Sequence, residues 1–198
     1  MDSGGTRRRA RRDIVLVALL CAAPVVASYA LFYGWKPGAA HAWFERFWDT
    51  RLDDQPGYTV VEIMHKALAP ESDPHKVRGM YIMGENPAMS DPDLHHARHA
   101  LASLQHLVVQ DIFMTETAYL ADVVLPASAF PEKTGTFSNT DRMVQLGRRA
   151  LDPPGEARQD LWIVQQMARR IGLDWRYEGE DSGVAQVFDE MRRCMPSI

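Results

Sequence analysis

The chain has 198 residues, of which 46% are hydrophobic and 24% charged, the ordinary balance of one globular domain with at most an appendage. Residues 1–13 carry five Arg and two Asp, whereas the other 185 residues carry 17 basic and 24 acidic side chains, so the acidic body has no electrostatic reason to bind nucleic acid. The two cysteines, Cys21 and Cys194, lie too far apart in sequence to form a zinc or iron–sulfur motif, and they do not favour a disulfide framework.

The N-terminal segment differs from the rest of the chain. Residues 14–33 carry no formal charge, and about 20 apolar residues is the length that crosses a bilayer core. Five Arg precede this run, which predicts a cytoplasmic N-terminus and a body on the far side of the membrane. We therefore expect residues 1–36 to form a basic leader with one transmembrane helix, with membrane association through residues 14–34. A cleaved signal peptide and a buried core helix are the alternatives.

The next part of the chain predicts a linker, three helices and one strand. Residues 37–40 indicate the linker, and aromatic residues spaced along 41–51 indicate an amphipathic helix. Thr59 and Glu62 have the spacing of a capping box for a helix that continues to about Ala69. A strand is expected at 77–83, followed by a helix capped by Ser90 or Asp91.

The C-terminal half predicts further short strands and helices. Strands are expected at 107–110, 123–125 and 143–146, with a short helix from Thr115 to about Leu120 between the first two. Residues 131–140 indicate a polar loop without regular structure, in which Glu132 and Lys133 form a solvated pair. An amphipathic helix is expected at 156–171 and a last helix at 184–193.

This order of elements predicts the fold class. Short apolar strands that alternate with helices are typical of an α/β protein with a mostly parallel, layered sheet and flanking helices. We expect residues 37–198 to form this partial dinucleotide-binding-like α/β domain, preceded by the N-terminal hydrophobic helix.

Polar residues follow the predicted strands at their carboxyl ends. Gly84, Glu85 and Asn86 come after one apolar strand, and Gln110 and Asp111 end the next. Glycine permits a positive φ or a close backbone approach, and the carboxyl edge of a parallel sheet is where such folds bind ligands. With the third strand, 122–126, these ends predict a rim that holds a nucleotide-like ligand.

Several blocks of this sequence resemble a known family. The blocks are 84–87, 109–118, 121–126, 132–142 and 150–160. In that order they closely resemble the large (alpha) subunit of molybdenum or tungsten formate dehydrogenases, in the molybdopterin oxidoreductase superfamily. The resemblance covers about residues 40–198, part of the family's subunit.

The resemblance implies a cofactor and a set of residues that bind it. The family uses a bis-(molybdopterin guanine dinucleotide) cofactor of molybdenum or tungsten, and this chain resembles part of its dinucleotide-binding unit. By motif, the cofactor-binding residues would be Gly84, Glu85, Asn86, Gln110, Asp111, Thr115, Asp122, Thr136, Asn139 and Asp141. A carboxylate suits a ribose diol or the N–H groups of guanine, and hydroxyl groups suit phosphates.

The resemblance also implies what the matched region lacks. In the family, the metal ligand, the formate-positioning residues and an iron–sulfur cluster belong to segments upstream of this region, so we predict no catalytic and no metal-binding residue here. We therefore expect a fragment of a formate dehydrogenase catalytic subunit, inactive alone, that works with the missing domains or other subunits. The alternatives are a non-catalytic nucleotide- or subunit-binding module and a membrane-anchored accessory protein of a respiratory complex. Soluble relatives imply a cytoplasmic location, whereas the N-terminal segment implies inner-membrane anchoring.

Overall fold

The structure, a computed structural model, describes residues 37–195, which divide into two compact units. One unit holds 37–57 together with 192–195, and the other holds 58–191. The predicted membrane-spanning segment therefore lies outside the described residues. Among residues 37–195, no helix has the length and apolar character needed to cross a bilayer.

The smaller unit is built around helix α2 (Pro37–Phe47). Phe44 and Leu52 are buried against Cys194, and the indole N–H of Trp43 donates to the Cys194 carbonyl at 2.8 Å. The backbone N–H of Leu52 donates to Glu45 Oε1 at 3.0 Å, which holds the chain after the helix against it. The prediction of a linker at 37–40 was wrong, because these residues form the first turn of α2.

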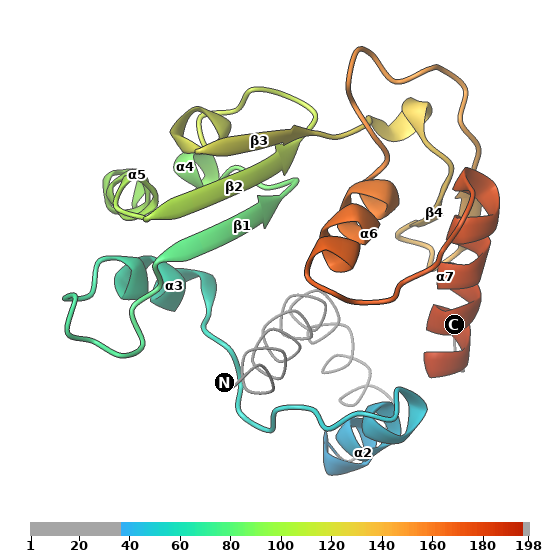
Figure 1. The fold of residues 1–198 in the computed structure, drawn as a ribbon, viewed down its shortest axis with the longest axis horizontal. Helices are drawn as coiled ribbons and strands as arrows, with labels where there is room; N and C mark the ends of the chain where they lie inside the picture. The colour runs from blue at the N-terminus through green and yellow to red at the C-terminus, as the bar shows by residue number, and fades with distance from the viewer. Residues whose placement is uncertain (1–36, 196–198) are drawn as a thin grey trace. The chain divides into compact units, whose positions relative to one another are not determined.

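The larger unit contains a parallel sheet in the order β1–β2–β3, which confirms the predicted α/β class (Figure 1). Strand β1 is Gly79–Met83, β2 is His106–Asp111 and β3 is Val123–Pro126. Both pairings are parallel, with Ile82 opposite Val109 and Val109 opposite Val124. All three strands therefore run in the same direction and end at one edge of the sheet. Each strand was expected within two residues of its observed bounds.

Helices cover one face of this sheet. They are α3 (Val60–Ala67), α4 (Pro87–Ser90) and α5 (Leu94–Ala102), with a 3-10 turn, η1 (Ala118–Leu120), beside them. Side chains alternate along a strand, so Ile82, Leu107 and Val109 share the face on which these helices pack. The buried cluster consists of Met64, Ala67, Ile82, Ala88, Ala97, Ala100, Leu101, Leu107, Val109 and Ala118.

The helix caps are partly those predicted. Thr59 Oγ1 accepts from the N–H of Glu62 at 3.3 Å, and Glu62 accepts from the N–H of Thr59 at 2.7 Å, so the predicted capping box of α3 is confirmed. The predicted cap of α5 was wrong. Asp93, rather than Ser90 or Asp91, caps it by accepting from the N–H of His96 at 3.1 Å.

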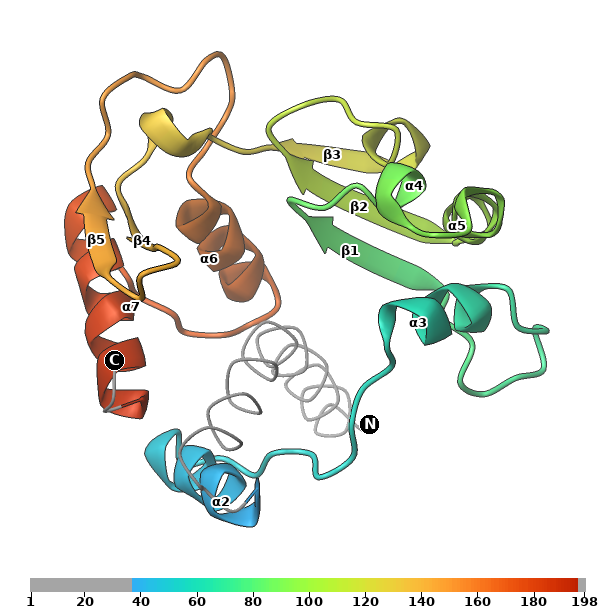
Figure 2. The same cartoon turned by 180° about the vertical axis from the view of Figure 1, so that it is seen from behind.

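The rest of the larger unit holds a second, antiparallel sheet and two helices (Figure 2). Strand β4 (Gly135–Ser138) pairs with β5 (Val144–Gly147) after the 3-10 turn η2 (Phe130–Glu132), so the prediction of an irregular loop at 131–140 was wrong. Helix α6 is Asp160–Arg170 and α7 is Glu180–Cys194. A Cβ on Gly147 would lie 2.7 Å from the Phe137 ring, so glycine is needed where the strands meet.

Candidate functional site

The candidate site is the edge at which β1 and β2 end. Met83 pairs with Gln110 at the end of the ladder, and the N–H of Gly84 donates to the Gln110 carbonyl at 2.9 Å. Gly84 has a φ of 65°, which confirms the expected use of glycine, and a Cβ built there would meet nothing within 4 Å. The chain therefore turns sharply after β1 beside the last residues of β2 and leaves open space above the turn.

Asn86 fastens the loop after β1 to the loop after β2. Its Oδ1 accepts from the backbone N–H of Thr117 at 3.2 Å and from its hydroxyl at 2.8 Å. Its Nδ2 donates to Glu116 at 2.8 Å, and this bond is the largest cause of the lowered pKa of Glu116. Thr117 is fully buried and also accepts from the N–H of Ala88 at 3.0 Å. Both ends of the Asn86 amide are therefore already used inside the chain.

Gln110 is the centre of a second internal network. The side chain is fully buried, its Oε1 accepts from the hydroxyl of Tyr81, and its Nε2 donates to Asp160 at 2.6 Å. The other oxygen of Asp160 pairs with Lys133. Burial, with a smaller effect from Asp160, raises the pKa of Tyr81 to about 12. The network therefore joins the sheet to the first turn of α6.

Three polar side chains at this edge keep unused hydrogen-bonding capacity. Asp111 Oδ1 accepts from the N–H groups of Ile112 at 2.7 Å and Phe113 at 3.4 Å, while Oδ2 has no partner among residues 37–195. Thr115 Oγ1 accepts from the N–H of Ala118 at 3.2 Å and keeps its own hydrogen. Glu85 is exposed and has no partner in the described part of the chain. Two carboxylates and one hydroxyl can therefore take a ligand.

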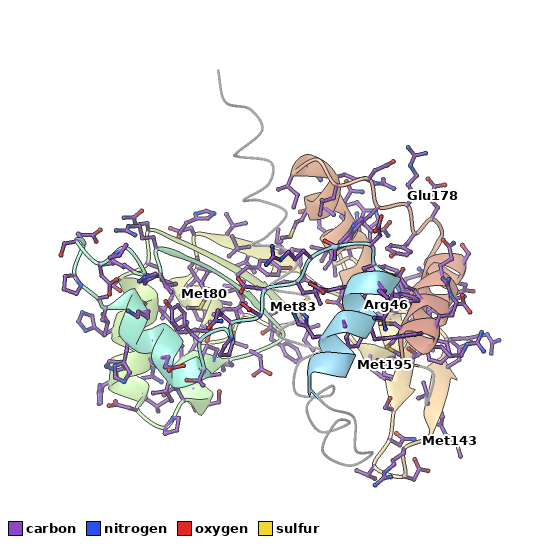
Figure 3. The ribbon with its side chains drawn as sticks, turned by 90° about the horizontal axis from the view of Figure 1, so that it is seen from below. Arg46, Met80, Met83, Met143, Glu178 and Met195 are labelled. Carbon is purple, nitrogen blue, oxygen red and sulfur yellow. The ribbon has the colours of Figure 1, made fainter. Side chains whose placement is uncertain are left out.

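The structure places the other four predicted residues elsewhere. Asp122 precedes β3, where its carboxylate accepts from the N–H of Leu107 at 2.7 Å, so it lies at the amino edge of the sheet, opposite the rim. Thr136 lies in β4, and Asn139 and Asp141 form the turn between β4 and β5. Figure 3 labels Met143, whose N–H donates to Asp141, well away from Met83 at the end of β1.

Sequence reasoning missed residues that hold the edge in place. Lys133 was expected to be solvated, but it pairs with Asp160, and Glu132 accepts from the N–H of Ala129 at 2.8 Å. Thr117 and Tyr81 also carry no local signal, because their partners lie 31 and 29 residues away. The alternation of β1 does indicate that Tyr81 points away from the face that carries Ile82.

Large apolar side chains are exposed in the loops that follow the strands. They are Ile112, Phe113 and Met114 after β2, Tyr119 in η1, and Phe130 after β3. Phe113 is 72% exposed and Tyr119 75%, values that are unusual for aromatic residues of a monomeric domain. Ile112, Phe113 and Met114 directly follow the end of β2, and we call these three residues the apolar edge patch. Such a patch is typical of a surface that contacts another polypeptide.

The comparison with protein families agrees with this geometry. The model of the molybdopterin oxidoreductase family matches residues 22–170. The chain belongs to the molybdopterin oxidoreductase family. The matched range includes β1, β2, β3 and the edge at which they end. In the part of this family member that the structure describes, no group of three or more His, Cys, Asp or Glu side chains is placed to hold a metal ion.

Curated relatives in this family are formate dehydrogenase alpha subunits. The chain is 46% identical over 153 residues to the F420-dependent formate dehydrogenase subunit alpha of Methanocaldococcus jannaschii, covering 77% of this chain and 22% of the relative. It is 42% identical over 158 residues to the F420-dependent formate dehydrogenase 1 subunit alpha of Methanococcus maripaludis, covering 80% and 22%. The expected resemblance is confirmed, and the chain spans about a fifth of the length of these relatives.

A solved structure shows the same fold. Acetylene hydratase from Pelobacter acetylenicus superposes with a TM-score of 0.53 over 69% of this chain and 19% of that protein, at 23% identity. At this identity the likeness concerns the fold alone. It supports the parallel sheet with flanking helices as the arrangement of this molybdopterin oxidoreductase segment.

Proposed function

We propose that this chain forms part of the catalytic subunit of a formate dehydrogenase, which oxidises formate to carbon dioxide and passes electrons to an acceptor such as NAD. We further propose that the edge where β1 and β2 end holds one guanosine end of a bis-(molybdopterin guanine dinucleotide) cofactor. The observation that carries the site is the presence of two unused acceptors, the Glu85 carboxylate and Asp111 Oδ2, beside the open turn at Gly84. The substrate rests on the formate dehydrogenase relatives.

The donor set at this edge fits a guanosine. The ribose diol and the N–H groups of guanine are donors, and they need acceptors that are not already bonded to the protein. Asp111 Oδ2 and the Glu85 carboxylate meet this need, and the Thr115 hydroxyl can donate to a phosphate or sugar oxygen. A Cβ at residue 84 would project into the open space above the turn, so glycine leaves that space to a ligand.

The chain's own residues bind and orient in this proposal. The Asn86 amide joins the loops after β1 and β2, and the Gln110 amide joins β2 to α6, so both hold the edge in place while Glu85 and Asp111 bind the ligand. When bound, the molybdenum or tungsten centre of the cofactor takes up the electrons released from formate. The remaining predicted residues, Asp122, Thr136, Asn139 and Asp141, have no role in this version of the site, because they lie on other edges and turns.

Partner segments complete the proposed enzyme. The matched region is 22% of the length of the relative, and the apolar edge patch directly follows Asp111 of the proposed cofactor edge. We infer that the missing domains or other formate dehydrogenase subunits cover this patch and close the pocket. The patch also favours a second function, in which the chain is a non-catalytic module that binds a nucleotide or a partner subunit.

Binding of guanosine diphosphate to the full chain tests the site. We expect saturable binding by calorimetry and a loss of about tenfold in affinity for Asp111→Asn. This variant keeps Oδ1, which the turn needs, and replaces the charged Oδ2. Asp141→Asn is the matched control, because Asp141 Oδ1 accepts from Met143 N–H in the same way, at 3.0 Å. Equal affinities for the two variants would remove Asp111 from the site.

Formate-dependent dye reduction tests the substrate and separates the two functions. We expect none from the chain alone, and activity with molybdenum or tungsten when the chain is co-purified with the rest of a formate dehydrogenase alpha subunit. The probe is the Methanocaldococcus jannaschii subunit from which the segment matching this chain has been deleted. A complex that contains the cofactor but reduces no dye would favour the non-catalytic module.

A further inference from the structure

A cavity of about 400 Å³ lies beside the first two turns of α6. Its lining comes from α6, from the loops before it and from the segment that follows it, and none of the ten predicted cofactor-binding residues contributes. The volume lies within the range of sites that bind small organic molecules, roughly 300–1,000 Å³. This cavity therefore needs its own explanation.

Hydrogen bonds hold the walls of the cavity together. Gln165 Nε2 donates to the Tyr177 carbonyl at 2.8 Å, and Gln165 Oε1 accepts from the Tyr177 N–H at 2.9 Å. Gln159 Nε2 donates to the Thr134 carbonyl at 2.7 Å. These bonds fix α6 to the segments on both sides of the cavity. A cavity with fixed walls loses little entropy when a ligand enters it.

The lining combines flat rings with an excess of positive charge. Trp162 is 48% exposed and Tyr177 is half-buried, so a ring face is available to a planar ligand. The charged residues of the lining are two arginines, Arg149 and Arg158, and one carboxylate, Glu132. Arg149 pairs with Asp152 at 2.9 Å. The guanidinium of Arg158 makes a single hydrogen bond, from Nη1 to the Ala157 carbonyl at 2.8 Å, and its other N–H groups have no partner within residues 37–195.

We propose that this cavity is a second binding site, specific for a planar organic anion of mononucleotide size. The ring of the ligand stacks on Trp162, and its phosphate or carboxylate accepts hydrogen bonds from Arg158. The indole N–H of Trp162, which has no hydrogen-bond partner in the described chain, donates to the ligand as well. This site is independent of the guanosine proposed at the strand edge.

Titration of the full chain with adenosine 5′-monophosphate, followed by tryptophan fluorescence, tests the proposal. We expect saturable quenching that disappears in Trp162→Phe and persists in Trp175→Phe, because Trp175 does not line the cavity. Arg158→Gln is expected to weaken binding about tenfold. The matched control is Arg170→Gln, which alters an exposed arginine at the C-terminal end of α6, outside the lining. Circular dichroism checks that each variant is folded.

Two further measurements test which part of the ligand is recognised and whether the cavity is separate from the cofactor edge. Inorganic phosphate alone should compete far more weakly than the mononucleotide, and Asp111→Asn should leave the quenching unchanged. If Arg158→Gln does not fold, Arg158→Lys, which keeps the charge and loses the planar fork, should show a smaller loss of affinity. Quenching that survives Trp162→Phe, equal affinities for the Arg158 and Arg170 variants, or equal competition by phosphate would overturn the proposal.

Discussion

Replacing Gln110 with methionine tests whether the buried amide holds the sheet to α6. The substitution keeps the length of the side chain but removes both hydrogen bonds, one from the Tyr81 hydroxyl and one to the carboxylate of Asp160. A bond to a charged group contributes about 1.5–3 kcal/mol and a neutral one about 0.5–1.5 kcal/mol. The side chain of Asp160 is 33% exposed, so water recovers part of the loss. We expect a decrease of about 2–3 kcal/mol in the free energy of unfolding.

Urea denaturation of the full chain, monitored by circular dichroism, measures this decrease. Gln145→Met is the matched control, because Gln145 is exposed on β5 and should change stability by no more than about 0.5 kcal/mol. A double-mutant cycle with Tyr81→Phe should give a coupling energy of about 0.5–1.5 kcal/mol. If Gln110→Met were as stable as Gln145→Met, the network would not hold the sheet to α6.

Two further predictions concern the turn at Gly84 and the response to alkaline pH. Gly84→Ala should lower the free energy of unfolding by about 1 kcal/mol, because alanine is strained at the positive φ of this residue although its Cβ would meet no other atom. Gly84→Asn should lower it less, because asparagine tolerates that conformation. Equal losses for the two variants in urea denaturation would contradict this explanation. Burial raises the pKa of Tyr81 to about 12, and burial with Glu190 raises that of Tyr177 to about 12. An unfolded tyrosine has a pKa of about 10, so the folded state binds more protons between these values and stability should fall as pH rises from about 10 to 12. Tyr81→Phe should make the free energy of unfolding fall less steeply over this pH range, as measured by urea denaturation at each pH. An unchanged pH dependence would show that Tyr81 does not cause part of the decline.

The sequence predicts well those features whose causes are local. The capping box needs only Thr59 and Glu62, three residues apart, and the strands of the parallel sheet are apolar runs bounded by turn residues. Strand β4 was missed because four residues rich in Gly, Thr and Ser indicate a loop until their partner strand is known. The partner strand, β5, follows a turn in which Arg142 adopts a φ of 66°, a conformation that is uncommon for arginine and cannot be predicted from the residue type.

The candidate site was harder to predict, because the residue types that bind a ligand also bind the protein. Asn86 and Gln110 were selected as cofactor ligands by the motif they share with the family, but their amides bond to Thr117 and Asp160, 31 and 50 residues away. Contacts over such separations depend on tertiary packing, which no local pattern encodes. Asp122 was selected as part of a strand end, although it precedes β3 and therefore lies at the opposite edge of the sheet.

Strand alternation explains why Gln110 and Asp111, which are adjacent, have different roles. Leu107 and Val109 face the helices, so the next side chain, Gln110, points to the other face, where it is fully buried and bonds to Asp160 at the start of α6. Asp111 comes one residue later at the end of β2, where its Oδ1 closes the turn and its Oδ2 stays uncommitted. A shift of one residue in the register of β2 would exchange these positions. The packing of Leu107 and Val109 in the core therefore determines which polar side chain fixes the edge and which remains available to a ligand.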